Sequence, residues 1–157
     1  MAQRSFGVRF GLLIALTSSA LISTPAPARA DDVGQIKVAK GAVHLERSGR
    51  KVPAPVGVKV QQGDVLVTGP DGSLGIIFLD ASLLSVGPSS VLAIDRFVFD
   101  STTNQGAFET SLKRGKLAAV SGKIAKQSPD AMKVRTPAAV LGVRGTEFLV
   151  HTIEPGD

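Results

Sequence analysis

Residue types that act as acid, base or nucleophile are sparse in this chain. Only two histidines occur, His44 and His151, and each lies among apolar neighbours typical of a strand. A serine hydrolase must bring its nucleophile, a histidine and an acid together, and no G-x-S-x-G segment supplies such a serine. We therefore predict no catalytic residues, and an unrecognised hydrolase is the last of three functional alternatives.

The carboxylates show no spacing that indicates a metal site. Several aspartates fall at turns, where this side chain bonds local backbone N–H groups, and these are Asp64, Asp71, Asp80, Asp95 and Asp100. No D-x-D-x-D-G segment and no zinc-spaced histidine pair occurs. Cysteine is absent, which excludes thiolate ligands, cysteine nucleophiles and disulfides. We predict neither a metal nor a cofactor.

The most informative charged residues are Arg144 and Glu147, which lie in an otherwise apolar stretch. Burying a charge is costly unless it is paired. Gly142 and Gly145 bracket the arginine, and bends there would turn both charges inward. The segment is no phosphate loop, because the G-K-[ST] ending and a following helix are missing. We predict that Arg144 is a partly buried clamp on Glu147 or on a turn carboxylate such as Asp80, with a ligand-binding arginine as the alternative.

The elements that must position these residues are short strands. Apolar and polar residues alternate with period two, for example at Val43 and Leu45 and again at Val65 and Val67. Turn signals recur about every 8 to 12 residues, and no stretch keeps a helical period over three turns. We predict an all-β domain, an irregular β-solenoid or roll of many short strands, with a β-sandwich as the alternative.

Four segments carry finer expectations. Pro53 and Pro55 make the piece around them an edge or a connection, because proline donates no ladder hydrogen bond. The continuous apolar run Gly75–Leu79 predicts a strand covered on both faces. The polar segment Lys123–Asp130 predicts a loop, and Ala138–Leu141 predicts a single helical turn.

The first thirty residues have the pattern of a secretory signal peptide. Arg4 and Arg9 make a basic start, a short apolar run spans Gly11–Ile22, and Ala28 with Ala30 forms an A-x-A cleavage site. The run is about a dozen residues, fewer than the roughly 20 that a spanning helix needs. We predict cleavage after Ala30, leaving residues 31–157 as a single periplasmic or secreted domain without a membrane span.

Charge composition argues against a nucleic-acid partner. The chain has 18 basic and 13 acidic residues, and three of the basic ones lie in the first thirty residues, which leaves 15 against 13. Lys113, Arg114 and Lys116 form the only tight basic cluster. Tryptophan and tyrosine are absent, so the chain has no obvious platform on which bases could stack. We predict no nucleic-acid partner.

Several short motifs occur in an order that resembles the FecR domain, over roughly Gly34–Val150. They are G-x-V-x-L at Gly41–Leu45, G-D-V-L-V-T at Gly63–Thr68, the run Gly72–Phe78 leading to Asp80-Ala81-Ser82, P-S-S-V-L at Pro88–Leu92, L-x-x-G-x-L at Leu112–Leu117 and T-P-x-A-V-L-G-V-R-G-T-E-F at Thr136–Phe148. Within the last motif we expect structural roles for Thr136, Pro137, Gly142, Arg144, Gly145, Thr146, Glu147 and Phe148.

The resemblance implies an all-β domain that works outside the cytoplasmic membrane. In regulator members of the family, this domain receives a signal from an outer-membrane transporter and passes it to a sigma factor. Those members carry a cytoplasmic segment and a spanning helix before the sensor domain, whereas a predicted signal peptide takes that place here. Direct transmembrane signalling is therefore not expected of this chain, and the family has no catalytic residues to carry over.

The resemblance also leads to a functional expectation. We expect a non-enzymatic domain that binds a protein or another envelope component, with signal sensing as its context. A structural or carbohydrate-binding envelope module is the first alternative. One departure from the family pattern is Ala81, which stands where glycine is usual, so a turn that needs positive φ at that residue would strain a side chain.

Overall fold

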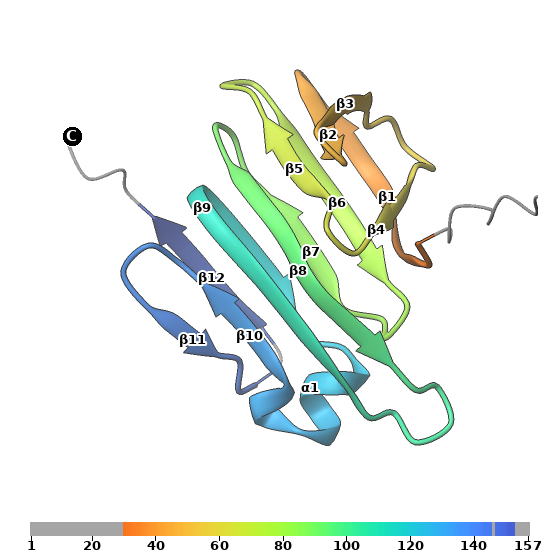
Figure 1. Ribbon diagram of the computed structural model, residues 1–157. Coiled ribbons are helices and arrows are strands. Elements are labelled where there is room, and N and C mark those ends of the chain that lie inside the picture. The colour runs from red at the N-terminus through yellow and green to blue at the C-terminus, as the bar shows by residue number, and fades with distance from the viewer. Residues whose placement is uncertain (1–29, 146, 153–157) are drawn as a thin grey trace, which may run out of the picture.

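The strands of the computed structural model, which describes residues 30–145 and 147–152, form one curled and almost wholly antiparallel sheet (Figure 1). They are β1 (Asp32–Lys40), β2 (Val43–Arg47), β3 (Arg50–Pro53), β4 (Lys59–Gln61), β5 (Val65–Thr68), β6 (Ser73–Phe78), β7 (Leu83–Val86), β8 (Val91–Phe99), β9 (Gly106–Val120), β10 (Met132–Arg135), β11 (Val140–Gly142) and β12 (Glu147–Thr152). The all-β prediction is confirmed. The sequence left a solenoid, a roll and a sandwich open, and the curled antiparallel sheet corresponds to the roll.

Paired strands run along two halves of the sheet that meet at a corner. In one half β2 pairs with β5, β5 with β8, and β8 with the first part of β9. In the other half β1 pairs with β6, β6 with β7, and β7 with the second part of β9. At this corner the chain passes between the halves four times, at residues 41–42, 69–72, 87–90 and 115. These bends make the corner, and β9, the long cyan strand in Figure 1, crosses it without a break.

The core lies between the two halves, because alternate residues of each strand face inward. Leu66, Leu92 and Leu112 come from one half and Ile76 and Leu84 from the other, and all are almost fully buried. Three phenylalanines complete one end of this core, namely Phe78, Phe97 and Phe108. Their ring centroids lie 4.6–5.6 Å apart, in the range of favourable aromatic contacts.

Gly115 allows β9 to cross the corner. Its φ is +93°, a backbone conformation that residues with a Cβ rarely adopt. A Cβ added there would overlap Ser90 of the neighbouring bend. The Ser90 hydroxyl accepts a 2.9 Å hydrogen bond from the backbone N–H of Lys116 and donates one of 3.0 Å to the carbonyl of Pro88. The two bends are thus held together by a buried serine and a glycine without a side chain.

Of the predictions for the proline segment and for the apolar run Gly75–Leu79, the first is confirmed and the second is wrong. Pro53 ends β3, which is the outermost strand beside β2, so the prediction of an edge is confirmed. The prediction that Gly75–Leu79 is covered on both faces is wrong. Burial alternates along β6, and Leu79 after it is 62% exposed. Within β6 the outward residues of this run are a glycine and the half-buried Ile77, which is why this part of the sequence lacks a polar face.

Two predictions about local structure are also wrong. Helix α1 (Lys123–Gln127) and the 3₁₀ turn η1 (Pro129–Ala131) occupy the expected loop, because Ile124 is fully buried and anchors the turn on the core. Ala138–Leu141 is not a helical turn. Thr136 bonds Ala139 through both its backbone and its hydroxyl, and this tight reversal sends β11 back along β10.

The predicted signal peptide lies outside the described residues apart from Ala30, and cleavage there stays a prediction. Within the described ranges, no helix has the length and apolarity needed to cross a membrane.

Candidate functional site

The closing motif does not form the predicted clamp. Arg144 and Glu147 are both exposed, and no ion pair between them occurs among the described residues. Val143 is the buried residue of the bend, at 4% exposure, and its N–H donates to the carbonyl of Met132. Because Val143 faces the core, the next residue turns to solvent. The prediction of a partly buried Arg144 is therefore wrong.

The other motif residues, apart from Phe148 in β12, lie between the end of β10 and the start of β12. The Thr136 hydroxyl accepts a 3.0 Å hydrogen bond from the N–H of Ala139, and Pro137 lies exposed between them. Gly145 has φ of +120°, and Phe148 packs half-buried against the core. Gly142 ends β11, and Thr146 lies outside the described residues. Their structural roles stay a prediction that mutation can test.

A partly buried charge pair does exist, but it joins Arg47 to Asp64. Asp64 is 1% exposed, and the guanidinium binds it in bidentate fashion, with 2.8 Å from Nε to Oδ1 and 2.7 Å from Nη2 to Oδ2. Asp64 also accepts from the N–H of Gln61 at 2.8 Å, and Arg47 donates to the carbonyl of Lys59 at 2.9 Å. The pair fastens β2 to the turn that connects β4 and β5.

The hydrogen bond to Asp64 raises the pKa of Arg47 above its ordinary value, partial burial opposes the rise, and the charge of Asp64 adds to it. Because the pKa of Arg47 is higher in the folded than in the unfolded state, the charged arginine stabilises the fold fully at any pH below its pKa in the unfolded chain. This stabilisation is lost only as the pH rises through the pKa of the folded state. The pH range in which the stabilisation is lost lies far above neutrality. The arginine side of the pair therefore contributes equally at all ordinary pH values.

A second buried carboxylate, Asp80, ties the β6–β7 turn to the start of α1. It is fully buried and accepts hydrogen bonds from the Ser82 N–H at 3.0 Å, the Ser82 hydroxyl at 2.7 Å and the Ile124 N–H at 3.4 Å. Ser82 Oγ in turn accepts from the N–H of Gly122 at 3.0 Å. The suggestion that Asp80 pairs with Arg144 is wrong, because local backbone and hydroxyl donors satisfy the carboxylate.

The middle residue of this turn, Ala81, has φ of +65°. A left-handed conformation costs a residue with a Cβ roughly 1–2 kcal/mol. Ala81→Gly removes this strain and loses part of the gain to the greater entropy of unfolded glycine, so we expect a net stabilisation of about 0.5–1 kcal/mol. Thermal unfolding monitored by circular dichroism measures it. Ala118→Gly, in the middle of β9, is the matched control and should destabilise; equal losses in both variants would contradict the prediction.

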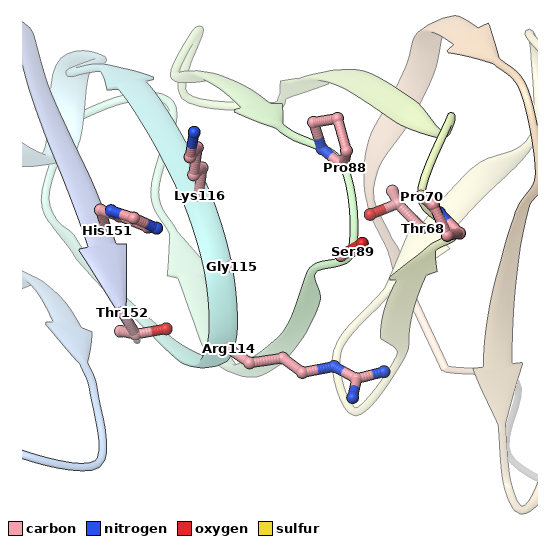
Figure 2. A pocket seen from close by; sticks show the side chains of 10 residues that line it. Thr68, Pro70, Pro88, Ser89, Arg114, Gly115, Lys116, His151 and Thr152 are labelled. Carbon is pink, nitrogen blue, oxygen red and sulfur yellow. The ribbon is translucent and has the colours of Figure 1, made fainter. Parts of the chain in front are cut away.

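A groove of about 620 Å³ follows the corner (Figure 2). It is lined by Thr68, Gly69, Pro70, Pro88, Ser89, Arg114, Gly115, Lys116, His151 and Thr152. Lys116 and His151 are direct cross-strand neighbours on β9 and β12, with Pro88 and Ser89 across the groove. Three of the lining side chains are basic, and none of the described lining residues is acidic.

The described groove lining consists of neutral and basic residues. Ser89 and His151 both line it, but no hydrogen bond joins a serine to His151 in the described part of the chain. His44 lies on β2, separated from β12 by three strands in the pairing order, and stands 3.8 Å from Glu46. The fold thus leaves the two histidines apart. Among residues 30–145 and 147–152, no three His, Asp or Glu side chains are grouped to hold a metal ion.

The sequence alone does not reveal the groove, although one signal points to it. Lys113, Arg114 and Lys116 form the single tight basic cluster, a pattern that is also typical of a solvated turn. Two of the three line the groove, because Gly115 between them bends the strand. The other lining residues come from three distant segments that only the corner brings together.

Fold and groove together define a small all-β domain, a curled antiparallel roll with an open basic groove along its corner. A family model described as FecR protein matches residues 64–156, more than half of the chain, and the chain therefore belongs to the FecR family, which is signalling-related. The sequence resemblance is thereby confirmed for β5 to β12 and the whole groove. No curated protein and no solved structure gives a match.

Proposed function

We propose that this protein is a non-enzymatic signalling domain that works in the periplasm or outside the cell and binds an envelope protein through the corner groove. Membership of the FecR family supports the signalling context. The signal-peptide pattern of the first thirty residues supports the location. The groove supports binding, since it is a hollow of about 620 Å³ on which several polar side chains converge.

The partner should present an extended acidic segment. The observation that carries this proposal is that Lys116 and His151 stand side by side on β9 and β12 in the lining of the groove. Complementary charge across an interface speeds association and selects the partner. A glycan is a weaker candidate, because the chain has no tryptophan or tyrosine and no phenylalanine lines the groove to support a sugar ring.

Reversing one groove charge should weaken partner binding. We expect Lys116→Glu to reduce affinity for the captured envelope protein by about five- to tenfold at low salt, since a rim charge contributes of order 1 kcal/mol. The measurement is capture from envelope extract on the immobilised protein, followed by titration of the purified partner. The effect should shrink as salt screens the charges.

Lys113→Glu is the matched control, because Lys113 is exposed on the same strand but does not line the groove. It should leave binding unchanged. Equal losses in the two variants would mean that net charge and not the groove governs capture. Binding to purified envelope glycans, or turnover of generic ester, glycoside or phosphate substrates, would favour the carbohydrate-binding or hydrolase alternative instead.

A further inference from the structure

Strand β12 forms one edge of the sheet and carries an exposed apolar residue. Among the described strands it pairs only with β9, which leaves its other side without a partner strand. Leu149 at its centre is 73% exposed, the highest value of any large apolar residue described. Glu147 and His151 lie two residues before and after it, so all three project from the same face.

Three other described strands, β3, β4 and β11, also pair with a single neighbour, and these strands carry the devices by which proteins prevent further strand pairing, whereas β12 does not. Edge strands are normally protected by short length, lysine, proline or bulges. β3 contains Lys51 and Pro53, β4 has only three residues and begins with Lys59, and β11 has only three residues. β12 has six residues, none of which is lysine, proline or glycine, and its register with β9 is regular. Among the described strands that pair with a single neighbour, β12 is the one without such a device.

The sequence of β12 is complementary to itself. When two copies pair antiparallel with the two-fold axis at Leu149, this residue meets its own copy. Glu147 then stands directly opposite His151 of the other chain, and the same pair recurs on the far side of the axis. Directly opposed apolar and oppositely charged residues are the contacts that stabilise paired strands.

We propose that β12 joins two copies of this chain into a dimer by antiparallel strand pairing centred on Leu149. The imidazole N–H of His151 donates to the Glu147 carboxylate of the other copy. On its own chain His151 stands beside Lys116, and Glu147 stands beside Val120, so the partner's carboxylate meets a basic pair. His151 and Thr152 also line the corner groove, which places the two grooves of the dimer near each other. The Glu147 carboxylate of the other copy then stands at the His151 end of the groove, so an acidic groove ligand and the dimer compete for that end.

Analytical ultracentrifugation over a range of protein concentrations tests the dimer. The purified protein should pass from monomer to dimer and stop there, because each copy has one such edge. Leu149→Lys should shift the dissociation constant at least tenfold upwards. Leu79→Lys, at an equally apolar residue that is 62% exposed but lies outside any strand, should leave it unchanged. A wild-type monomer at every concentration, or a dimer insensitive to Leu149→Lys, overturns the proposal.

Charge exchange tests the register. Glu147→Lys places a lysine opposite His151, and His151→Glu places two carboxylates opposite each other, so each variant alone should be at least tenfold weaker in self-association. When the two variants are mixed, the introduced lysine of one faces the introduced glutamate of the other, and the unchanged Glu147 and His151 face each other. The mixture should therefore form a heterodimer. Circular dichroism confirms that both variants are folded. Failure of the mixture to associate excludes this register and with it the proposal.

Discussion

Asp80→Ala is expected to lower the free energy of unfolding by about 3–5 kcal/mol. The carboxylate is fully buried and accepts from two backbone N–H groups and one hydroxyl. Each buried donor that loses its acceptor costs about 1–3 kcal/mol. For a domain of this size the melting temperature should fall by roughly 10–20 °C. Thermal and urea unfolding monitored by circular dichroism measure both quantities.

Two further variants separate the hydrogen bonds of Asp80 from a general effect of losing a carboxylate. Asp80→Asn keeps one acceptor oxygen and should lie between the wild type and Asp80→Ala. Asp130→Ala removes an exposed carboxylate from η1 and should change stability by less than about 0.5 kcal/mol. If Asp80→Ala melts within a few degrees of the wild type, Asp80 does not hold the β6–β7 turn to α1.

Arg47→Ala is expected to cost about 2–4 kcal/mol. It leaves the Asp64 carboxylate, which is 1% exposed, with a single remaining donor at Gln61. Breaking a buried pair by removing one partner costs about 3–5 kcal/mol, and the value is reduced here because the side chain of Arg47 is 32% exposed. Urea unfolding gives the difference, and the slope with denaturant should stay constant.

The matched control for this pair is the other arginine that the sequence singles out. Arg144→Ala removes an exposed guanidinium and should be nearly neutral. Arg47→Lys keeps the charge but loses the bidentate contact, so it should recover only part of the stability. Equal melting temperatures for Arg47→Ala and Arg144→Ala would show that the Asp64 pair contributes nothing.

The contrast between these arginines shows what the sequence can and cannot predict. Sequence reasoning predicts a planar guanidinium bound to a turn carboxylate, and the protein has one. The predicted residues are wrong because Arg144 follows a buried valine and so turns outward, whereas Arg47 meets Asp64 only where β2 pairs with β5. Alternation along one strand is readable from the sequence, but the partner of a strand is a long-range property.

The same distinction explains the fold and the groove. Period-two alternation and recurring turns predict an all-β chain. The alternate burial along β5, β6 and β7 follows from that alternation. The corner is not predictable in this way, because it needs the bends near Gly69, Pro88 and Gly115 to align in space. A groove built from such bends has no motif of its own in the sequence.

The position of β9 determines when the domain becomes complete as the chain emerges N-terminus first. β9 pairs with β7, β8, β10 and β12, so it is the common partner of both halves. Until residues 106–120 appear, β7 and β8 each keep an open edge, and such edges invite wrong pairing. We therefore expect the sheet to close late, when most of the chain is available. Transfer of the chain across a membrane in an extended state, with folding only after β9 has emerged, would avoid such wrong pairing better than folding segment by segment.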